Sequence, residues 1–413
     1  MRIAIWHNLP SGGGKRALHD QVRGLVGRGH AVEIWCPSTA NRTFLPLDGL
    51  APEHVLPLRW RSVDSHSRLH ESIRWALLDR HRNLRALDAH CADAAEQILR
   101  GGFDVLLAHG SAQMAVAPIA RHLPIPRVLY LQEPERAIYE AMPDWPWIPP
   151  RLRDVRWSSL DSILGHLGGR TLLRYFTDLA RAEQENVRAF DRVLANSLYS
   201  RESILRAHAV DARVCYLGID TELFVDRGLP REGFAVGIGS FTPSKNIDHV
   251  TRALGRVREP RPRLVWIGNA SVPGVLDGLQ RLAASVGVAF QPRENVRNEE
   301  LVDLLNRASM MVYAPRLEPF GFAPLEANAC ALPVVAVAEG GVRETVVDGV
   351  NGLLVAPDLS SMAAAVERLR DDPGLAARLG RNGRELVVGR WSQEAAMDRL
   401  ERALLEVASR EAP

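Results

Sequence analysis

Short, fully apolar runs alternate with longer stretches of helical periodicity along almost the whole chain, and this pattern constrains the fold most. Continuous Val, Ile and Leu runs separated by helices predict parallel strands that helices cover on both faces. We expect strands at residues 3–6, 32–35, 105–108, 128–131 and 193–195, and later at 235–238, 264–267, 310–313 and 334–337. Such sheets bind ligands at the carboxyl ends of their strands.

The pattern also predicts two domains of ordinary size, since 413 residues can build two separate cores. After Leu217–Asp220 the chain runs through a polar, turn-rich stretch at 226–233, and the strand–helix rhythm then starts afresh. We therefore expect an N-terminal lobe over residues 1–217 and a C-terminal lobe over 218–390. Residues 391–413 are expected to contain one amphipathic helix.

Charge and cysteine content exclude several classes of protein. The net charge of +2 gives no reason to expect a nucleic-acid partner. Cys36, Cys91, Cys215 and Cys330 lie far apart without CxxC spacing, so we expect neither a disulfide framework nor a metal cluster. Met1–Trp6 is too short an apolar run for a secretion signal, and no run reaches the roughly 20 residues of a membrane helix. We expect a cytoplasmic protein.

Two stretches interrupt the rhythm, at residues 59–100 and 134–175. The second contains several prolines together with Tyr139, Trp145, Trp147, Trp157 and Tyr175. A simple α/β domain does not need an aromatic insertion this long, so it is a candidate lid or acceptor platform. Two alternatives stay open: a satellite cluster of packed helices, or a peripheral contact with the cytoplasmic face of a membrane.

The strongest local signal lies between Glu318 and Glu326, after the expected strand at 310–313. Pro324 suits the first turn of a helix, which places Glu318 above a strand end and Glu326 in the first turn. Near Gly321 the backbone can approach a ligand closely, and free N–H groups at a helix start favour an anion such as a diphosphate. The two carboxylates would accept O–H bonds from sugars.

Other motifs follow neighbouring strands. Gly340–Glu344 comes after the strand at 334–337, and Gly239–Asn246 comes after the first strand of the second lobe. Within the latter, Lys245 can reach a phosphate as a point charge. Each motif alone could be a turn, and we interpret Asp348-Gly349 as one, but their order and spacing together indicate a site.

The first lobe carries a weaker glycine signal. Gly12-Gly13-Gly14 joins the first expected strand to a helix, and a glycine loop there lets the backbone approach a diphosphate. The pattern is neither GxGxxG nor a P-loop, and three glycines can simply form a tight turn. His109, Gln132 and Glu133 end two further strands. A histidine at a strand end is more often structural than catalytic.

From about Val193 to Trp391 the chain resembles glycosyltransferase family 4, whose members are retaining enzymes of the GT-B fold. The resemblance is carried by the Glu-x7-Glu motif Glu318–Glu326, Gly340–Glu344, Pro333–Val335, Lys245-Asn246 and Leu217–Asp220. It implies an α/β fold of two Rossmann-like lobes whose parallel sheets face each other across a crevice. It further implies an acceptor-side N-terminal lobe, a nucleotide-sugar-binding C-terminal lobe, and a C-terminal helix that packs back toward the first lobe.

The resemblance also implies roles. Glu318 would bind and orient the donor sugar, and Lys245 would hold the diphosphate and stabilise the leaving group, so these two are the catalytic candidates. Glu326 would bind the ribose. Further donor contacts would come from Gly13, Gly14, Phe320, Gly321 and Phe322, and from the base-pocket loop between Arg293 and Val296. His109, Gln132 and Glu133 are candidates for the acceptor or sugar side.

Two positions depart from the family. Ser240 stands where the family usually has Arg, so a phosphate contact would be missing unless Lys15, Arg16 or Arg343 replaces it. Gln132 stands where many members carry His near the donor sugar, and Gln cannot act as an acid or base at neutral pH. Glu133 is then the nearest ionisable group of this lobe.

The expected function is retaining transfer of a sugar from a UDP- or GDP-sugar to an acceptor hydroxyl of a glycan, a lipid or a small molecule, as in polysaccharide biosynthesis. No cofactor and no metal are expected, since a DxD pair is not evident near the crevice. One alternative is a catalytically decayed GT-B protein that only binds nucleotide or sugar, which Ser240 and Gln132 motivate. Another is a GT-B epimerase, against which the Glu-x7-Glu and Lys245 pattern argues.

Overall fold

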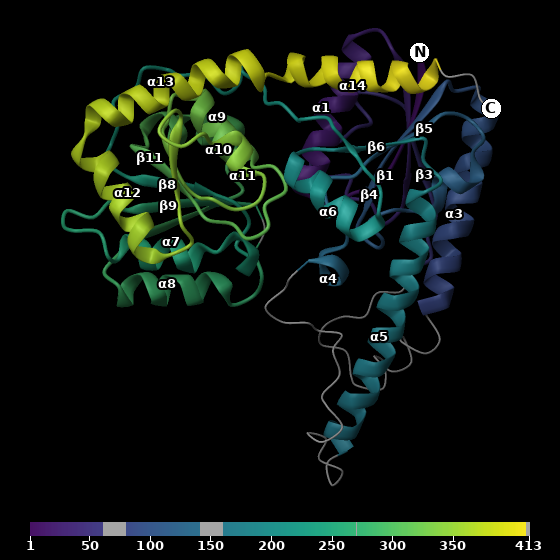
Figure 1. The fold of residues 1–413 in the computed structure, drawn as a ribbon, viewed down its shortest axis with the longest axis horizontal. Coiled ribbons are helices and arrows are strands. Elements are labelled where there is room, and N and C mark those ends of the chain that lie inside the picture. The colour runs from purple at the N-terminus through teal and green to yellow at the C-terminus, as the bar shows by residue number, and fades with distance from the viewer. Residues whose placement is uncertain (61–79, 141–159, 270, 410–413) are drawn as a thin grey trace. The chain divides into compact units, whose positions relative to one another are not determined.

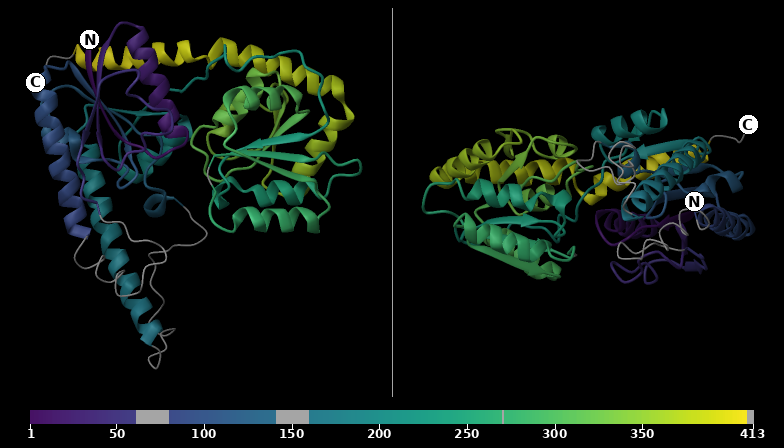
Figure 2. Two further views of the ribbon diagram at one scale, coloured as in Figure 1. Left: turned by 180° about the vertical axis from the view of Figure 1, so that it is seen from behind. Right: turned by 90° about the horizontal axis from the view of Figure 1, so that it is seen from below.

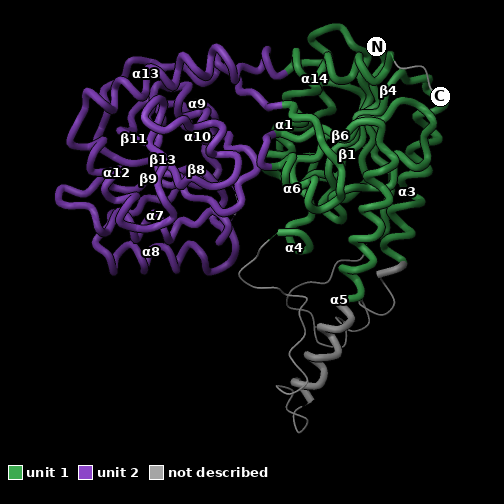
Figure 3. Tube along the Cα trace, viewed as in Figure 1, with its two compact units in different colours: residues 1–196, 200–215, 397–413 green, residues 197–199, 216–396 purple. Residues whose placement is uncertain are grey.

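The computed structural model describes residues 1–60, 80–140, 160–269 and 271–409 (Figure 1). The chain forms two compact units, coloured separately in Figure 3. Unit 1 comprises residues 1–196, 200–215 and 397–413, and unit 2 comprises residues 197–199 and 216–396. Each unit is built around one parallel sheet, so the expected pair of Rossmann-like lobes is confirmed.

The sheet of unit 1 has seven strands in the order β3-β2-β1-β4-β5-β6-β7. The strands are β1 (Arg2–Asn8), β2 (Ala31–Pro37), β3 (Glu53–Leu56), β4 (Val105–Ser111), β5 (Arg127–Tyr130), β6 (Arg192–Ala195) and β7 (Arg213–Val214). The central register pairs Ile3 with Val32 on one side and with Val105 on the other, in parallel. All three side chains are buried, as continuous apolar strands require.

Helices cover both faces of this sheet (Figure 2). The helices that precede unit 2 are α1 (Gly13–Gly27), α3 (Arg80–Gly101), α4 (Arg136–Tyr139), α5 (Leu160–Val187), α6 (Leu198–His208) and the 3-10 turn η2 (Pro118–His122). Helices α3 and α5 bury Leu87, Ile98 and Leu179 against one face, in a cluster with Trp6 and Leu106. Alternate strand residues such as Ile3 and Ile5 are buried on the other face.

Unit 2 has a six-stranded parallel sheet in the order β10-β9-β8-β11-β12-β13. Its strands are β8 (Ala235–Ile238), β9 (Leu264–Gly268), β10 (Phe290–Glu294), β11 (Met310–Tyr313), β12 (Val334–Val337) and β13 (Gly352–Val355). Its helices are α7 (Ile247–Leu254), α8 (Val275–Ser285), α9 (Asn298–Arg307), α10 (Phe322–Ala329), α11 (Val342–Thr345), α12 (Leu359–Asp371) and α13 (Pro373–Arg390). Trp266, Val312 and Val335 pack with α7, α8 and α12 in one continuous core.

The last helix, α14 (Gln393–Ala408), belongs mostly to unit 1. Its Met397 fills the space beside Gly24 of α1, where a Cβ atom would come within 2.6 Å of the Met397 sulfur. Glu401 pairs with Arg28 at 2.6 Å and with His30 at 2.7 Å. The expectation that the C-terminal helix packs back onto the N-terminal lobe is therefore confirmed.

The two irregular stretches are described only in part. Residues 61–79 and 141–159, which include Trp145, Trp147 and Trp157, lie outside the described residues. Within the described part, Tyr175 is buried against the unit 1 core and Tyr139 is half-buried. None of the described helices is both long enough and apolar enough to cross a bilayer.

Candidate functional site

The motifs of unit 2 all follow the carboxyl ends of its parallel strands. Residues 239–246 follow β8, residues 314–321 follow β11 and residues 338–341 follow β12, while Asn295 follows the edge strand β10. Since these strands run in the same direction, the four loops meet at one edge of the sheet. This is the edge where open α/β sheets bind ligands.

Lys245 and Glu318 form an ion pair at this edge. The Lys245 Nζ atom lies 2.7 Å from Glu318 Oε2, and their side chains are 27% and 14% exposed. Lys245 ends the short 3-10 turn η4 (Pro243–Lys245), and Asn246 in the left-handed conformation then turns the chain into α7. Both catalytic candidates thus lie together, with the ammonium group partly open to solvent and able to exchange a carboxylate for a phosphate.

Helix α10 begins beside Glu318 with uncapped N–H groups. Its N-cap residue is Gly321 with φ 97°, a conformation that glycine adopts without strain, and no side chain caps the first turn. The first turn holds no acidic residue, because Glu326 is the fifth residue of α10, so the expectation that Glu326 lies in the first turn was wrong. The backbone N–H groups at this start and the positive end of the helix dipole favour an anion here, and anion binding stays a prediction.

Two glycines fix the backbone that carries Glu318. A Cβ atom on Gly340 would lie 2.3 Å from the Glu318 carbonyl oxygen, and one on Gly341 would lie 2.3 Å from that of Pro319. The Gly341 N–H donates to the Glu318 carbonyl at 2.8 Å. The Gly340-Gly341 pair is therefore needed because the loop after β12 packs directly on the loop after β11.

Arg343 and Glu344 have structural partners within unit 2. The Arg343 Nε atom donates to the carbonyl of Gly340 at 3.2 Å. Glu344 accepts the backbone N–H groups of Leu198 and Tyr199 at 2.9 and 3.0 Å, and the Tyr216 hydroxyl at 2.8 Å. These contacts hold the start of α6 and the loop after β12, so Arg343 supports the loop at Gly340.

The remaining donor-binding candidates surround the same sheet edge. Glu326 lies in α10 and is 2% exposed, and Phe320 is equally buried against Phe322 and Trp391. Arg293 is exposed at the end of β10, and Val296 is half-buried two residues beyond Glu294. The Asn295 N–H donates to the Gly268 carbonyl at 2.9 Å, which ties this loop to the end of β9.

Ser240 has a neighbouring arginine that sequence reasoning missed. The Ser240 hydroxyl bonds Asn269 Oδ1 at 3.3 Å, so position 240 itself supplies no cation. The Arg316 backbone N–H donates to the Ser244 carbonyl at 2.8 Å, which places an exposed arginine beside the loop that carries Lys245. In the sequence, the only indication of a role for Arg316 was its position two residues before Glu318.

Unit 1 has a cavity of about 330 Å³ at the carboxyl ends of its own strands. Gly13 and Gly14 of α1, Gln132 and Glu133 line it, together with Ser111, Ala115, Glu135 and Arg136. Gln132 Nε2 donates to the Gly14 carbonyl at 3.5 Å, and Glu133 pairs with Arg136. The structure thus brings four of the predicted residues to one cavity, hereafter the unit 1 pocket.

His109 and Lys15 do not line the unit 1 pocket. His109 is 1% exposed and stacks on Tyr130, and burial lowers its pKa to about 3, which keeps the ring neutral. Lys15 is fully buried, and its Nζ atom has no hydrogen-bond partner among the described residues. Lys15 therefore does not replace the family arginine.

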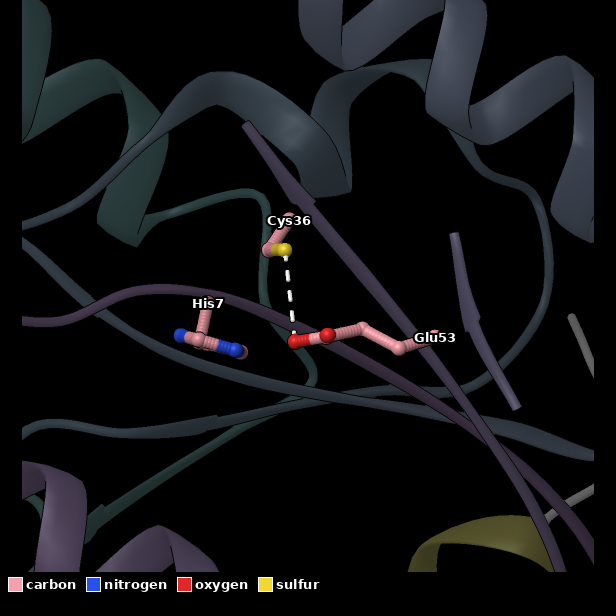
Figure 4. Close-up of side chains that lie close together, drawn as sticks. All are labelled: His7, Cys36 and Glu53. Atoms are coloured by element: carbon pink, nitrogen blue, oxygen red, sulfur yellow. Dashed lines mark hydrogen bonds between the residues drawn. The ribbon is translucent and has the colours of Figure 1, made fainter. Parts of the chain in front are cut away.

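A buried cluster of His7, Cys36 and Glu53 lies on the first three strands of unit 1 (Figure 4). Their ligand atoms lie within 4.8 Å of one another, a spacing that would suit a metal ion. The Cys36 thiol instead donates to Glu53 at 3.6 Å, and burial raises the pKa of Cys36 to about 12. Arg42 pairs with Glu53 at 2.8 Å and Lys15 lies nearby, so two cationic side chains already face the cluster. We assign it no metal.

Two family matches together cover most of the chain. Residues 11–223 match the family described as Glycosyltransferase Family 4, and residues 221–386 match the one described as Glycosyl transferases group 1. The first match covers more than half of the chain.

Two curated relatives are similar over about half of the chain. One is an alpha-maltose-1-phosphate synthase of Mycobacterium tuberculosis, 31% identical over 238 residues, covering 51% of this chain and 62% of the relative. The other is a D-inositol 3-phosphate glycosyltransferase of Streptomyces avermitilis, 31% identical over 224 residues, covering 48% of each chain. The matched region therefore spans only about half to three-fifths of these relatives.

Solved structures are similar over nearly the whole chain. A sucrose-phosphate synthase from Thermosynechococcus elongatus has a TM-score of 0.70 at 19% identity and covers 98% of this chain and 100% of its own. Anabaena HepE in complex with UDP-glucose has a TM-score of 0.67 at 17% identity with the same coverage. At these identities the likeness concerns the fold.

Proposed function

The chain belongs to glycosyltransferase family 4 and has its GT-B fold, and we propose that it transfers a sugar from a nucleotide-sugar to an acceptor hydroxyl with retention of configuration. The observation that carries this proposal is the Lys245–Glu318 ion pair beside the uncapped start of α10. Together these groups offer a carboxylate for sugar hydroxyls and positive charge for a departing diphosphate.

In the proposed reaction the bond between the donor sugar carbon and the diphosphate oxygen breaks, and the acceptor oxygen bonds to the same carbon. The acceptor proton passes to the leaving phosphate oxygen, so no strong protein base is required. Lys245 and the N–H groups around Phe320, Gly321 and Phe322 stabilise the negative charge that develops on the diphosphate. Glu318 orients the sugar, and Glu326 binds the ribose.

We propose a UDP- or GDP-sugar as the donor, with the loop from Arg293 to Val296 beside the base. HepE has been solved with UDP-glucose, which makes UDP-glucose the first probe. No metal is proposed, since Lys245 and the helix start supply the positive charge. A cytoplasmic location fits the four cysteines, which are free and buried.

We propose that the unit 1 pocket binds the acceptor. Gln132, Glu133 and Glu135 offer amide and carboxylate oxygens that hydroxyl groups can donate to, and Gly13 and Gly14 expose backbone. A glycan, a lipid headgroup or a small polyol fits this chemistry. The relative from Streptomyces avermitilis is named for D-inositol 3-phosphate, which is a suitable first acceptor probe.

A thermal-shift titration with UDP, GDP, ADP and dTDP and their sugars, with and without EDTA, tests the donor. A ligand at about 100 times its Kd should stabilise the protein by about 2.7 kcal/mol. Transfer is then measured for Lys245→Ala and Glu318→Ala, with Glu385→Gln on the exposed side of α13 as control. Losing one charge-assisted bond of roughly 1.5–3 kcal/mol lowers turnover about 10- to 100-fold. Undiminished turnover in both variants would refute the proposal.

A second candidate function is nucleotide or sugar binding without catalysis. Ser240 and Gln132, which lack the cation and the imidazole of the family, are the observations that favour it. It predicts that no nucleotide shifts the unfolding temperature strongly and that nucleotide-sugars are neither transferred nor hydrolysed.

A further inference from the structure

Glu183 is a fully buried carboxyl group beside the unit 1 pocket. It lies in α5 with 0% exposure, and its Oε1 atom accepts the backbone N–H of Ala115 at 2.6 Å. Ala115 itself lines the pocket. Glu183 therefore holds part of the pocket wall from behind, without lining the pocket itself.

A second residue of α5 holds the same wall segment. Asn186, one helical turn further on, donates from Nδ2 to the Val116 carbonyl at 2.9 Å and contacts the Met114 sulfur at 3.4 Å. The segment 114–116 is thus attached to α5 through two buried side chains. Of these two, only Glu183 can change its charge with pH.

The surroundings of Glu183 disfavour a negative charge. Its Oε2 atom is buried and has no hydrogen-bond partner among the described residues. Glu135 approaches from the α4 segment, where it accepts the Ala137 N–H at 3.2 Å and lines the pocket. An ionised Glu183 would therefore place a negative charge in the interior, close to a second carboxylate, and the backbone N–H groups of Ala115 and Val116 would offset this only in part.

The other titratable groups near Glu183 do not compensate. Tyr139 from α4 and Tyr175 from α5 both face the two carboxyl groups, and burial raises the pKa of both hydroxyls, that of Tyr175 to about 12. His208 packs on Tyr139, and burial lowers its pKa to about 4, so it stays neutral. The nearby Arg121 of η2 lies 3.8 Å from the exposed Glu185.

Burial, with a smaller contribution from Glu135, raises the pKa of Glu183 to about 8. The folded protein then binds a proton that the unfolded chain has released at its ordinary value of 4.5. Stability contributed by this group is full below 4.5, falls as the pH rises toward 8, and stays low above it.

We propose that Glu183 is a positioning residue for the unit 1 pocket: it holds the Ala115 wall, and a proton on its carboxyl group lets it tolerate the adjacent Glu135. This inference deepens the proposed function, since it assigns pH-dependent acceptor binding to the same pocket. As the pH rises toward 8, an opened segment in which Glu183 is ionised and separated from Glu135 becomes more favourable, by up to about tenfold per pH unit. Above pH 8 this advantage no longer grows.

Hydrogen exchange tests this without any substrate. Protection of the amides of residues 114–117 and 136–139 is measured from pH 6 to pH 10 and corrected for intrinsic exchange. In the unmodified chain we expect protection to fall by up to about tenfold per pH unit from pH 6 to about pH 8 and to level off above it. Glu183→Gln keeps an oxygen for the Ala115 N–H and cannot ionise, so its protection should stay constant. Glu185→Gln, an exposed neighbour on α5, should behave like the unmodified chain.

A second variant keeps the test decisive if Glu183→Gln does not fold. Glu135→Gln removes the neighbouring charge, so the loss of protection with rising pH should be smaller and should level off at a lower pH. An identical pH response in the unmodified chain and in Glu183→Gln, or in Glu135→Gln when that is the variant available, would overturn the proposal.

Activity provides the readout that a purely structural role would not change. With UDP-glucose as donor, the KM for the acceptor should rise with pH up to about pH 8 and then level off in the unmodified chain, and stay flat in Glu183→Gln, while donor hydrolysis changes equally in both. A chain that transfers no sugar would refute the proposed function alone. The exchange experiment would still decide the role of Glu183, so the two failures are distinguishable.

Discussion

Lysine is rare in this chain, and this makes Lys245 conspicuous. Lys15 and Lys245 are the two lysines, although lysine and arginine together number 51. Lys15 is a fully buried residue of α1, whereas the Lys245 side chain is 27% exposed. Almost all the other basic side chains of the chain are arginines. The proposed diphosphate site therefore differs from most basic positions in that it carries an ammonium group, that of Lys245.

This rarity allows a direct chemical test. An amine-reactive acylating reagent should label the N-terminus and Lys245 but not the buried Lys15. A bound nucleotide-sugar should slow labelling of Lys245 at least tenfold, because its phosphates would cover the ammonium group. Mass spectrometry of the peptides quantifies each site, with the N-terminal label as internal control. Unchanged labelling of Lys245 under saturating UDP-glucose would argue against contact with the donor.

Ser240 and Arg316 make a second prediction at the residue scale. Arg316 is attached to the Lys245 loop through the Ser244 carbonyl and is exposed. If it supplies the cation that Ser240 lacks, Arg316→Ala weakens donor binding about tenfold or more, as loss of a charge-assisted contact of roughly 1.5–3 kcal/mol implies. Calorimetric titration with the donor measures this. Adding Ser240→Arg to the Arg316→Ala variant should restore much of the donor affinity. If Arg316→Ala does not weaken donor binding and Ser240→Arg does not strengthen it, Arg316 does not supply the cation that Ser240 lacks.

At the scale of elements, the loops after β11 and β12 act as one unit. The Gly341 N–H bonds the Glu318 carbonyl, and the two glycines leave no room for a side chain. A rigid pairing of this kind positions Glu318 and the start of α10 together. The candidate donor-binding groups are therefore fixed by backbone contact more than by side-chain hydrogen bonds.

Gly341→Ala tests this coupling. A Cβ atom 2.3 Å from the Pro319 carbonyl forces the two loops apart, so we expect a loss of transfer of about 100-fold or more, since small misplacements near the chemistry have effects of that size. Gly389→Ala in α13, where a Cβ atom meets no other atom within 4 Å, is the matched control and should be neutral. Equal activity of the two variants would contradict the argument.

The sequence predicts the bounds of the buried central strands well and misses edge strands. Strands β8, β11 and β12 have the expected bounds, because continuous buried apolar runs leave little alternative. Strands β3, β7 and β10 were not predicted: Glu53–Leu56 is largely half-buried, β7 has two residues, and β10 is an edge strand with Pro292, Arg293 and Glu294. Edge strands have one neighbour and little burial, so their composition carries little signal.

The candidate site could be predicted where it depends on strand ends and not where it depends on helix faces. That Lys245 and Glu318 follow parallel strands was visible in the sequence, and the structure places them in contact. Glu183 and Arg316 were missed, since one is a single glutamate within a long helix and the other follows an unremarkable proline. Their relevance comes from neighbours distant in sequence. The functional roles of all these residues stay predictions.

At the scale of the whole molecule, Glu401 attaches the last helix, α14, to the segment that follows α1 in unit 1. It pairs with His30 and Arg28, and the His30 bond, followed by that to Arg28, lowers the pKa of Glu401. A lowered carboxyl pKa contributes stability that is present above the unfolded value and lost as the pH falls through the folded value. The attachment of α14 should therefore weaken under acid conditions, below about pH 4.5.

Glu401→Gln measures this contribution. Thermal unfolding between pH 3 and pH 7 should show a lower midpoint for the variant at pH 7, and the gap should narrow as the pH falls below 4.5. Glu394→Gln, at the start of the same helix, is the control and should keep the dependence of the unmodified chain. A constant gap at all pH values would assign the effect to packing instead of charge.

The position of α14 in unit 1 has a consequence for how the protein is made. A ribosome releases residues 1–215 long before residues 397–408, yet the core beside α1 needs Met397, Leu400 and Leu404, which are buried. Unit 2 needs no residue beyond 396. The first-synthesised unit is therefore the last to be finished, and during elongation it presents an unfilled apolar groove along α1. A nascent chain of this kind is a natural client for chaperones that act at the ribosome exit.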